Sequence, residues 1–203
     1  MEKLNKLRIL ILCMIILPLG CTPPAKELAK HEKQSPLVVF LVRHAEKLEY
    51  SMEKDSDLTE EGYIRANELA RTLADAEIEY VHSTDLIRTR NTAAPVAALF
   101  GLELELYAKS DLYDLADKIE SSGGRHLVVG HSNTTPMLVE ILGGEPGLPI
   151  AEATEYDRLY ILTISKGGVN TVLLRYGRSC SSELSRISAS SRLVPQTSGS
   201  ALN

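Results

Sequence analysis

Short apolar runs alternate along this chain with longer stretches in which apolar residues recur at helical spacing. The apolar runs predict strands at 37–42, 78–81, 102–106, 126–129, 160–165 and 169–176. The periodic stretches predict helices at 59–76, 85–100, 112–119 and 134–142. Pro95 is expected to perturb or break the second helix, because proline lacks the N–H group of the helical ladder. This alternation is typical of an α/β fold with a mainly parallel sheet, to which the last two strands add an antiparallel edge.

The first residues of the chain have the pattern of an export signal. Basic residues precede the apolar segment from Ile9 to Leu19, which is too short to span a bilayer comfortably. The following Gly20-Cys21 resembles a bacterial lipoprotein signal, although Pro18 stands where an aliphatic residue is usual. We therefore expect a signal peptide at 1–20, lipidation of Cys21, and a protein anchored by lipid to the cell envelope. An ordinary secretory signal or an uncleaved anchor are the alternatives.

Composition divides the rest of the chain into three parts. Residues 21–36 contain prolines and charged residues and are predicted to be a solvated tether. Residues 37–177 contain all the predicted strands and helices and form the expected domain. Residues 178–203 are rich in serine, lack apolar periodicity, and are predicted to be a disordered tail.

The overall composition excludes some function classes. The net charge of −5 and the absence of tryptophan disfavour a nucleic-acid partner. All three cysteines lie outside the predicted domain, which leaves no basis there for a disulfide, a thiol nucleophile or a cysteine metal site.

Polar residues lie at or shortly after the ends of three of the predicted strands. Arg43-His44 follows the first, Arg88 comes shortly after the second, and Gly130-His131 follows the fourth. The carboxyl ends of parallel strands share one edge of a sheet, which is where ligands bind in such folds. Arginine matches the oxygens of phosphate in a two-pronged geometry, so this edge is predicted to bind a tetrahedral oxyanion.

Four sequence motifs carry a resemblance to a known family. They are Leu41-Val42-Arg43-His44-Ala45-Glu46-Lys47, Leu58-Thr59-Glu60-Glu61-Gly62, the segment from Ser83 to Ala93 around Arg88, and Val128-Val129-Gly130-His131-Ser132-Asn133. In this order they resemble the histidine phosphatase superfamily, also called the phosphoglycerate mutase-like family. The resemblance covers roughly residues 37–176 and implies a three-layer α/β sandwich.

The resemblance also implies roles for individual residues. His44 would be the nucleophile and would become a phosphohistidine, which requires that one ring nitrogen be unprotonated and the other be held by a backbone acceptor. Arg43, Arg88 and His131 would bind the phosphoryl oxygens and stabilise their charge in the transition state. Asn133 is a further candidate contact to the phosphate, or a cap of the following helix. The family pattern implies no metal and no organic cofactor.

A proton donor for the leaving group is harder to place. The family uses a carboxylate between the third and fourth motifs, and this interval contains Asp111 and Asp114. We favour Asp114, while neither residue lies in a firmly matched motif. If neither reaches the site, a phosphohistidine or acyl phosphate would react more readily than an alkyl phosphate.

Several alternatives stay open. The leading hypothesis is a metal-independent phosphomonoester hydrolase acting on a phosphorylated small molecule or phosphoprotein. The others are a non-catalytic phosphate-binding lipoprotein, a phosphoglycerate mutase-type phosphotransferase, and a zinc hydrolase using His44, His82 and His131. Outside the motifs, His82 is expected to pack at the rim and His126 to lie at the surface. The segment from Glu155 to Arg158 either lines the pocket or pairs charges at the surface.

Overall fold

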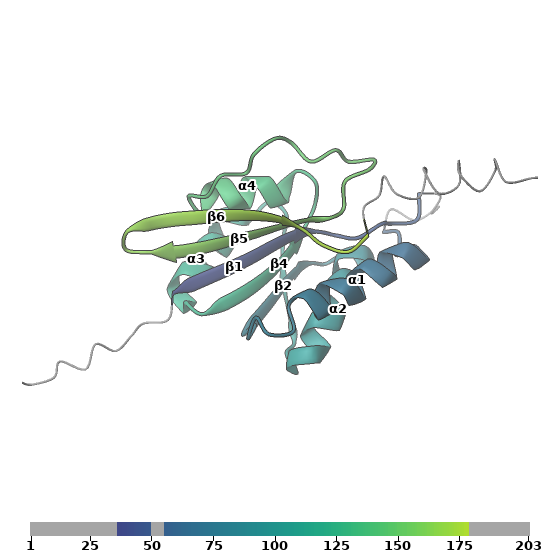
Figure 1. The fold of residues 1–203 in the computed structure, drawn as a ribbon, viewed down its shortest axis with the longest axis horizontal. Coiled ribbons are helices and arrows are strands. Elements are labelled where there is room, and N and C mark those ends of the chain that lie inside the picture. The colour runs from purple at the N-terminus through teal and green to yellow at the C-terminus, as the bar shows by residue number, and fades with distance from the viewer. Residues whose placement is uncertain (1–35, 50–54, 179–203) are drawn as a thin grey trace, which may run out of the picture. The chain divides into compact units, whose positions relative to one another are not determined.

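The computed structural model describes residues 36–49 and 55–178, which form a sheet of six strands with helices on both faces (Figure 1). The strands are β1 (Leu37–Arg43), β2 (Tyr80–Thr84), β3 (Leu104–Tyr107), β4 (Arg125–Gly130), β5 (Arg158–Ser165) and β6 (Gly168–Arg175). The helices are α1 (Glu60–Thr72), α2 (Ile87–Phe100), α3 (Leu112–Ser122) and α4 (Thr134–Ile141).

The predicted signal peptide, the Cys21 lipidation site, and nearly all of the tether and the serine-rich tail lie outside the described residues. None of the helices within 36–49 and 55–178 is long and apolar enough to cross a bilayer.

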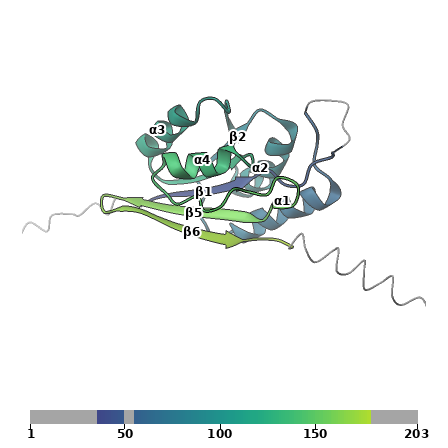
Figure 2. The ribbon, with the colours of Figure 1, turned by 90° about the horizontal axis from the view of Figure 1, so that it is seen from above.

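The sheet has the strand order β3-β2-β4-β1-β5-β6. The first four strands in this order pair in parallel, whereas β5 pairs antiparallel with both β1 and β6. Figure 2 shows the β5–β6 hairpin along one edge of the sheet. The predicted class, a mainly parallel sheet with an antiparallel edge, is therefore confirmed.

Two apolar cores lie on opposite faces of the sheet and make the fold a three-layer sandwich. In one core, α1 and α2 pack on the sheet through Leu69, Ala93 and Val96. In the other, α3 and α4 pack on it through residues such as Ile119 and Leu138. Strand β1 sends alternate side chains into both cores, which explains why its sequence is a continuous apolar run rather than an alternating one.

Two expectations about the elements are met only in part: α2 is not broken at Pro95, and the second strand has other bounds. Helix α2 continues unbroken through Pro95, although the proline removes one N–H from its ladder. Val96 and Ala97 beside the proline are buried against the sheet, and this packing offsets the lost hydrogen bond. The strand predicted at 78–81 runs instead from Tyr80 to Thr84, so its polar end belongs to the sheet itself.

The opening of α1 joins the first and second sequence motifs. Thr59 caps the helix and accepts a hydrogen bond from the Gly62 N–H at 3.1 Å. The Thr59 N–H in turn donates to the Glu46 carbonyl at 2.9 Å. A side chain at position 62 would place its Cβ 2.2 Å from this carbonyl oxygen, so only glycine fits.

We expect the substitution Gly62→Ala to lower the free energy of unfolding by about 2 kcal/mol or more, because the new methyl group forces the loop away from α1. Denaturant unfolding measures this loss. Gly167→Ala is the matched control, since a Cβ there meets only the Ser165 hydroxyl oxygen, at 3.7 Å. Equal stability of the two variants would contradict the proposed close approach.

Candidate functional site

The parallel pairing of β1 with β4 brings two of the motifs together. Arg43 lies opposite Gly130 in the register, and the His44 N–H donates to the Gly130 carbonyl at 2.9 Å. The imidazole rings of His44 and His131, which come directly after these two strands, have centroids 5.5 Å apart. The expected convergence at the carboxyl edge of the sheet is therefore present in the structure.

The ring of His44 has one engaged and one open nitrogen. Its Nδ1 lies 2.8 Å from the Ala45 carbonyl oxygen, which can only accept, so the neutral ring carries its proton on Nδ1. Burial, together with the positive charges of Arg43 and Arg88, lowers the pKa of His44 to about 3. At neutral pH the Nε2 atom is therefore unprotonated, as a nucleophile requires.

Helix α2 supports the backbone directly after His44. The Ala45 N–H donates to the Thr92 hydroxyl oxygen at 2.9 Å, and the same hydroxyl donates to the Arg88 carbonyl at 2.7 Å. Both Ala45 and Thr92 are buried. This pair of bonds fixes the backbone at Ala45, the residue whose carbonyl orients His44, a role that the sequence pattern did not reveal.

His131 is held in a similar way by the end of β2. The Thr84 hydroxyl lies 3.0 Å from Nε2 of His131 and 2.9 Å from the Thr89 hydroxyl in α2. Burial and the positive charges of Arg88, Lys109 and Arg43 lower the pKa of His131 to about 4. Both histidines are therefore neutral at pH 7 in a site whose formal charges are positive.

The two arginines of the site keep some of their N–H groups unused. The Nε and Nη2 groups of Arg43 and the Nε group of Arg88 are buried and have no hydrogen-bond partner within the described part of the chain. Arg88 lies 3.7 Å from the carboxylate of Asp55, and the same carboxylate caps α2 through the Ile87 N–H. Unpaired buried donors are costly, and a bound oxyanion would satisfy them.

Asn133 occupies the N-cap position of α4, but its side chain does not cap the helix. Its side chain is exposed and makes no capping hydrogen bond to the helix. The Thr134 hydroxyl instead accepts from the His131 N–H at 3.0 Å. The alternative that Asn133 serves as a helix cap is therefore wrong, while its contact to a phosphate stays a prediction.

The two candidate proton donors lie at the start of α3. Asp111 is the N-cap residue and Asp114 is in the first turn, and both are exposed. Since α3 follows the carboxyl end of β3, it begins at the same edge of the sheet as His44. Neither carboxylate bonds His44 or His131 in the described residues, so the assignment of Asp114 stays a prediction.

His82 and His126 belong to a separate buried group. Their rings are joined at 2.9 Å between Nε2 of His82 and Nδ1 of His126, and Glu105 lies 3.2 Å from the other nitrogen of His82. His126 is fully buried, so its predicted surface position is wrong: it points under α3 and bonds the Gly123 carbonyl. Within 36–49 and 55–178, no three His, Cys, Asp or Glu side chains lie close enough to hold a metal ion.

A cavity of about 830 Å³ adjoins the site. It lies between the start of α1 and the loop before β5, and Tyr156 and Glu46 are among its walls. The Tyr156 ring is 6.2 Å from the His44 ring and 4.0 Å from the guanidinium carbon of Arg43. Tyr156 thus lies beside both His44 and the cavity, and it belongs to the segment from Glu155 to Arg158, for which the sequence left pocket lining open.

The comparison with family models gives one match. Residues 39–116 match the model of the histidine phosphatase superfamily, branch 1. This range contains His44, Arg88 and both candidate acids, and it ends before His131. The resemblance read from the motifs is therefore confirmed. No curated protein matches the chain in the corresponding sequence search.

Solved structures with the same fold include several phosphatases. The protein histidine phosphatase SixA complexed with tungstate is 20% identical, with a TM-score of 0.55 over 72% of this chain and 99% of SixA. A mycobacterial glucosyl-3-phosphoglycerate phosphatase is 16% identical, with a TM-score of 0.54 over 71% of this chain and 100% of that one. The α-ribazole phosphatase of Shigella flexneri is 15% identical, with a TM-score of 0.55 over 70% and 98%. The phosphoglycerate mutase-like fold implied by the resemblance is thus confirmed.

We expect the lowered pKa values of the site histidines to be visible by NMR. At pH 5.5 the ring nitrogens of His44 and His131 should report neutral imidazoles, with the His44 proton on Nδ1. His44→Asn and His131→Asn identify the signals. A midpoint near the ordinary value of about 6.5 for His44 would contradict the buried, cationic environment.

The same pKa values predict how stability depends on pH. Between pH 6.5 and about 3, the unfolded chain binds protons at His44 and His131 that the folded protein does not. The folded state should therefore lose stability as the pH falls through this window. Chemical denaturation at pH 7 and pH 5 tests this, and His131→Asn should weaken the dependence.

Proposed function

We propose that this relative of the histidine phosphatases hydrolyses phosphorylated substrates without a metal, through a phosphohistidine on His44. The observation that carries the proposal is the state of the His44 ring. Its Nδ1 is bound to the Ala45 carbonyl, its ring is neutral, and nearby buried arginine N–H groups have no partner in the described residues. An unprotonated ring nitrogen beside unsatisfied cationic donors suits attack on a phosphoryl group.

The chemistry requires two displacements at phosphorus. In the first, Nε2 of His44 forms a bond to phosphorus while the bond to the leaving group breaks. In the second, a water molecule attacks the phosphohistidine, which releases phosphate and restores Nε2. Arg43, Arg88 and His131 stabilise the charge on the equatorial oxygens in both steps. The Ala45 carbonyl stabilises the positively charged ring of the phosphohistidine, because it accepts a hydrogen bond from the Nδ1–H group in both steps.

A leaving group that needs little help from an acid suits this site best. Asp111 and Asp114 are exposed at the start of α3 and bond neither site histidine in the described residues. The leaving group of a phosphohistidine that is protonated on its second nitrogen is a neutral imidazole, and the leaving group of an acyl phosphate is a carboxylate. We therefore propose phosphoramidates or acyl phosphates as substrates, with Asp114 as the donor for poorer leaving groups.

Two alternatives predict different behaviour of the same site. A non-catalytic phosphate-binding lipoprotein would retain binding but lack turnover. A phosphoglycerate mutase-type enzyme would return the phosphoryl group to a second acceptor rather than to water.

For the hydrolase and for both alternatives, we propose export and attachment to the cell envelope through lipid on Cys21, from the sequence of the first residues.

The proposal predicts hydrolysis of p-nitrophenyl phosphate that survives EDTA and is inhibited by vanadate. His44→Ala should lower kcat by at least about a thousandfold, because the nucleophile is lost. His126→Asn, a change at a buried histidine outside the site, controls for the loss of an imidazole from the fold. Loss of activity in EDTA would point to metal chemistry, and vanadate binding without turnover would favour the non-catalytic alternative.

The role of Asp114 can be tested with leaving groups of different basicity. Asp114→Asn should lower kcat/KM for an alkyl phosphate by about a hundredfold and change it little for a phosphoramidate, because only the alkoxide requires a proton. Asp111→Asn, three residues earlier on the same turn, is the comparison. Full activity of both variants on the alkyl phosphate would reject this assignment.

A further inference from the structure

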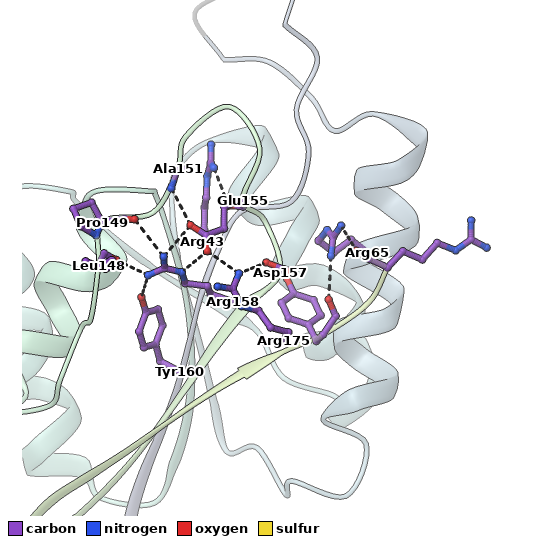
Figure 3. A network of polar contacts seen from close by, with 12 residues as sticks. Arg43, Arg65, Leu148, Pro149, Ala151, Glu155, Asp157, Arg158, Tyr160 and Arg175 are labelled. Carbon is purple, nitrogen blue, oxygen red and sulfur yellow. Dashed lines mark hydrogen bonds and ion pairs between the residues drawn. The ribbon is translucent and has the colours of Figure 1, made fainter. Parts of the chain in front are cut away.

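The guanidinium group of Arg43 is held by the loop before β5 rather than by a carboxylate. Its Nη1 donates to the Glu155 carbonyl at 3.0 Å (Figure 3). Its central carbon lies 4.0 Å from the centre of the Tyr156 ring. These two contacts engage the Nη1 group and one face of the Arg43 guanidinium. The Nε and Nη2 groups stay buried without partners in the described residues. The direction of these free donors is thus set by residues 155 and 156.

The position of Glu155 is in turn fixed by its own side chain. Both carboxylate oxygens accept from Arg158, at 2.7 and 2.9 Å, and the Ala151 N–H and Arg175 donate to the same carboxylate. Burial opposes the charged form, but these donors outweigh it and lower the pKa of Glu155 to about 2. The carboxylate is therefore ionised throughout the pH range in which the protein works.

Arg158 connects this loop to the sheet. It is the first residue of β5 and is buried. Beyond Glu155, its guanidinium donates to the Leu148 carbonyl at 2.6 Å and to the Tyr160 hydroxyl at 2.9 Å. Figure 3 shows these bonds converging on Arg158 from both ends of the loop. A continuous path of charge-assisted bonds therefore runs from β5 through Arg158 and Glu155 to Arg43.

We propose that Glu155 and Arg158 are positioning residues for Arg43: their bidentate ion pair fixes the Glu155 carbonyl and so aims the free Arg43 donors at a phosphoryl group. The inference rests on the proposed phosphoryl chemistry at His44. It assigns a function to the Glu155–Arg158 ion pair of this loop. The charged atoms of this pair contact neither the site histidines nor Arg43. A misdirected guanidinium would lose its two-pronged contact, since such contacts depend on orientation as well as charge.

A double-mutant cycle separates positioning from general stabilisation. Glu155→Gln keeps the shape of the side chain and removes its charge. In the wild-type background, it should weaken vanadate binding by about tenfold, as measured by calorimetry, and raise KM for p-nitrophenyl phosphate. In an Arg43→Ala background, the same change should alter vanadate affinity less than about twofold, because the residue that it positions is absent.

Two further variants complete the experiment. Glu77→Gln breaks an ion pair with Arg125 at the opposite edge of the sheet and should leave vanadate affinity unchanged in both backgrounds. Arg175→Gln removes one exposed partner of Glu155 and serves if Glu155→Gln fails to fold. It should give a smaller loss of affinity, about threefold, that also disappears with Arg43→Ala.

If Glu155→Gln changed vanadate affinity by the same factor in the wild-type and Arg43→Ala backgrounds, the inference would be overturned, because the ion pair would then act on the whole fold and not through Arg43. Unchanged affinity in a folded Glu155→Gln variant would overturn it as well. Since the cycle reads vanadate affinity rather than turnover, it stays decisive if the protein binds vanadate but hydrolyses nothing. That last result would reject the proposed hydrolysis alone.

Discussion

The parallel pairing of β1 with β4 is the constraint on which the site depends. It sets Arg43 against Gly130 in the register and lets the His44 N–H bond the Gly130 carbonyl. Two histidines from distant parts of the sequence thereby follow neighbouring strands and approach to 5.5 Å between ring centroids. Both strands are buried on both faces by the two helical layers, which holds this edge rigid. A slip in register would separate the two rings.

The electrostatics of this edge follow from placing cations and neutral rings together in a buried position. Arg43 and His44 are almost fully buried, and the arginine charges help keep His44 and His131 unprotonated. Buried donors of Arg43 without partners in the described residues are unfavourable for stability in the free protein. Such a site gains stability when an anion enters, because the anion supplies the missing acceptors. Under the proposed function, the arrangement trades stability of the free protein for binding of a phosphoryl group.

Much of this arrangement could be predicted from the sequence, and the remainder depends on contacts that leave no local pattern. Alternating apolar runs predict the mainly parallel sheet, and the Arg-His and Gly-His pairs predict its functional edge. The orientation of His44 by the Ala45 carbonyl was required by its expected role and is found in the structure. Tyr156 and the Glu155–Arg158 pair were ambiguous, because charged residues before a strand occur equally at surfaces. His126 was misplaced because a polar residue at the start of a strand gives no sign of a buried partner such as His82.

The central claim is that His44 carries the phosphoryl group during turnover, and trapping this species tests it most directly. The protein is mixed with a phosphoramidate, stopped with base within milliseconds, and digested for mass spectrometry. We predict a phosphoryl group on His44 that is stable in base, is lost in acid, and forms and decays as fast as the substrate turns over. A phosphoryl group on another residue, or turnover without any phosphorylated His44, would contradict the account.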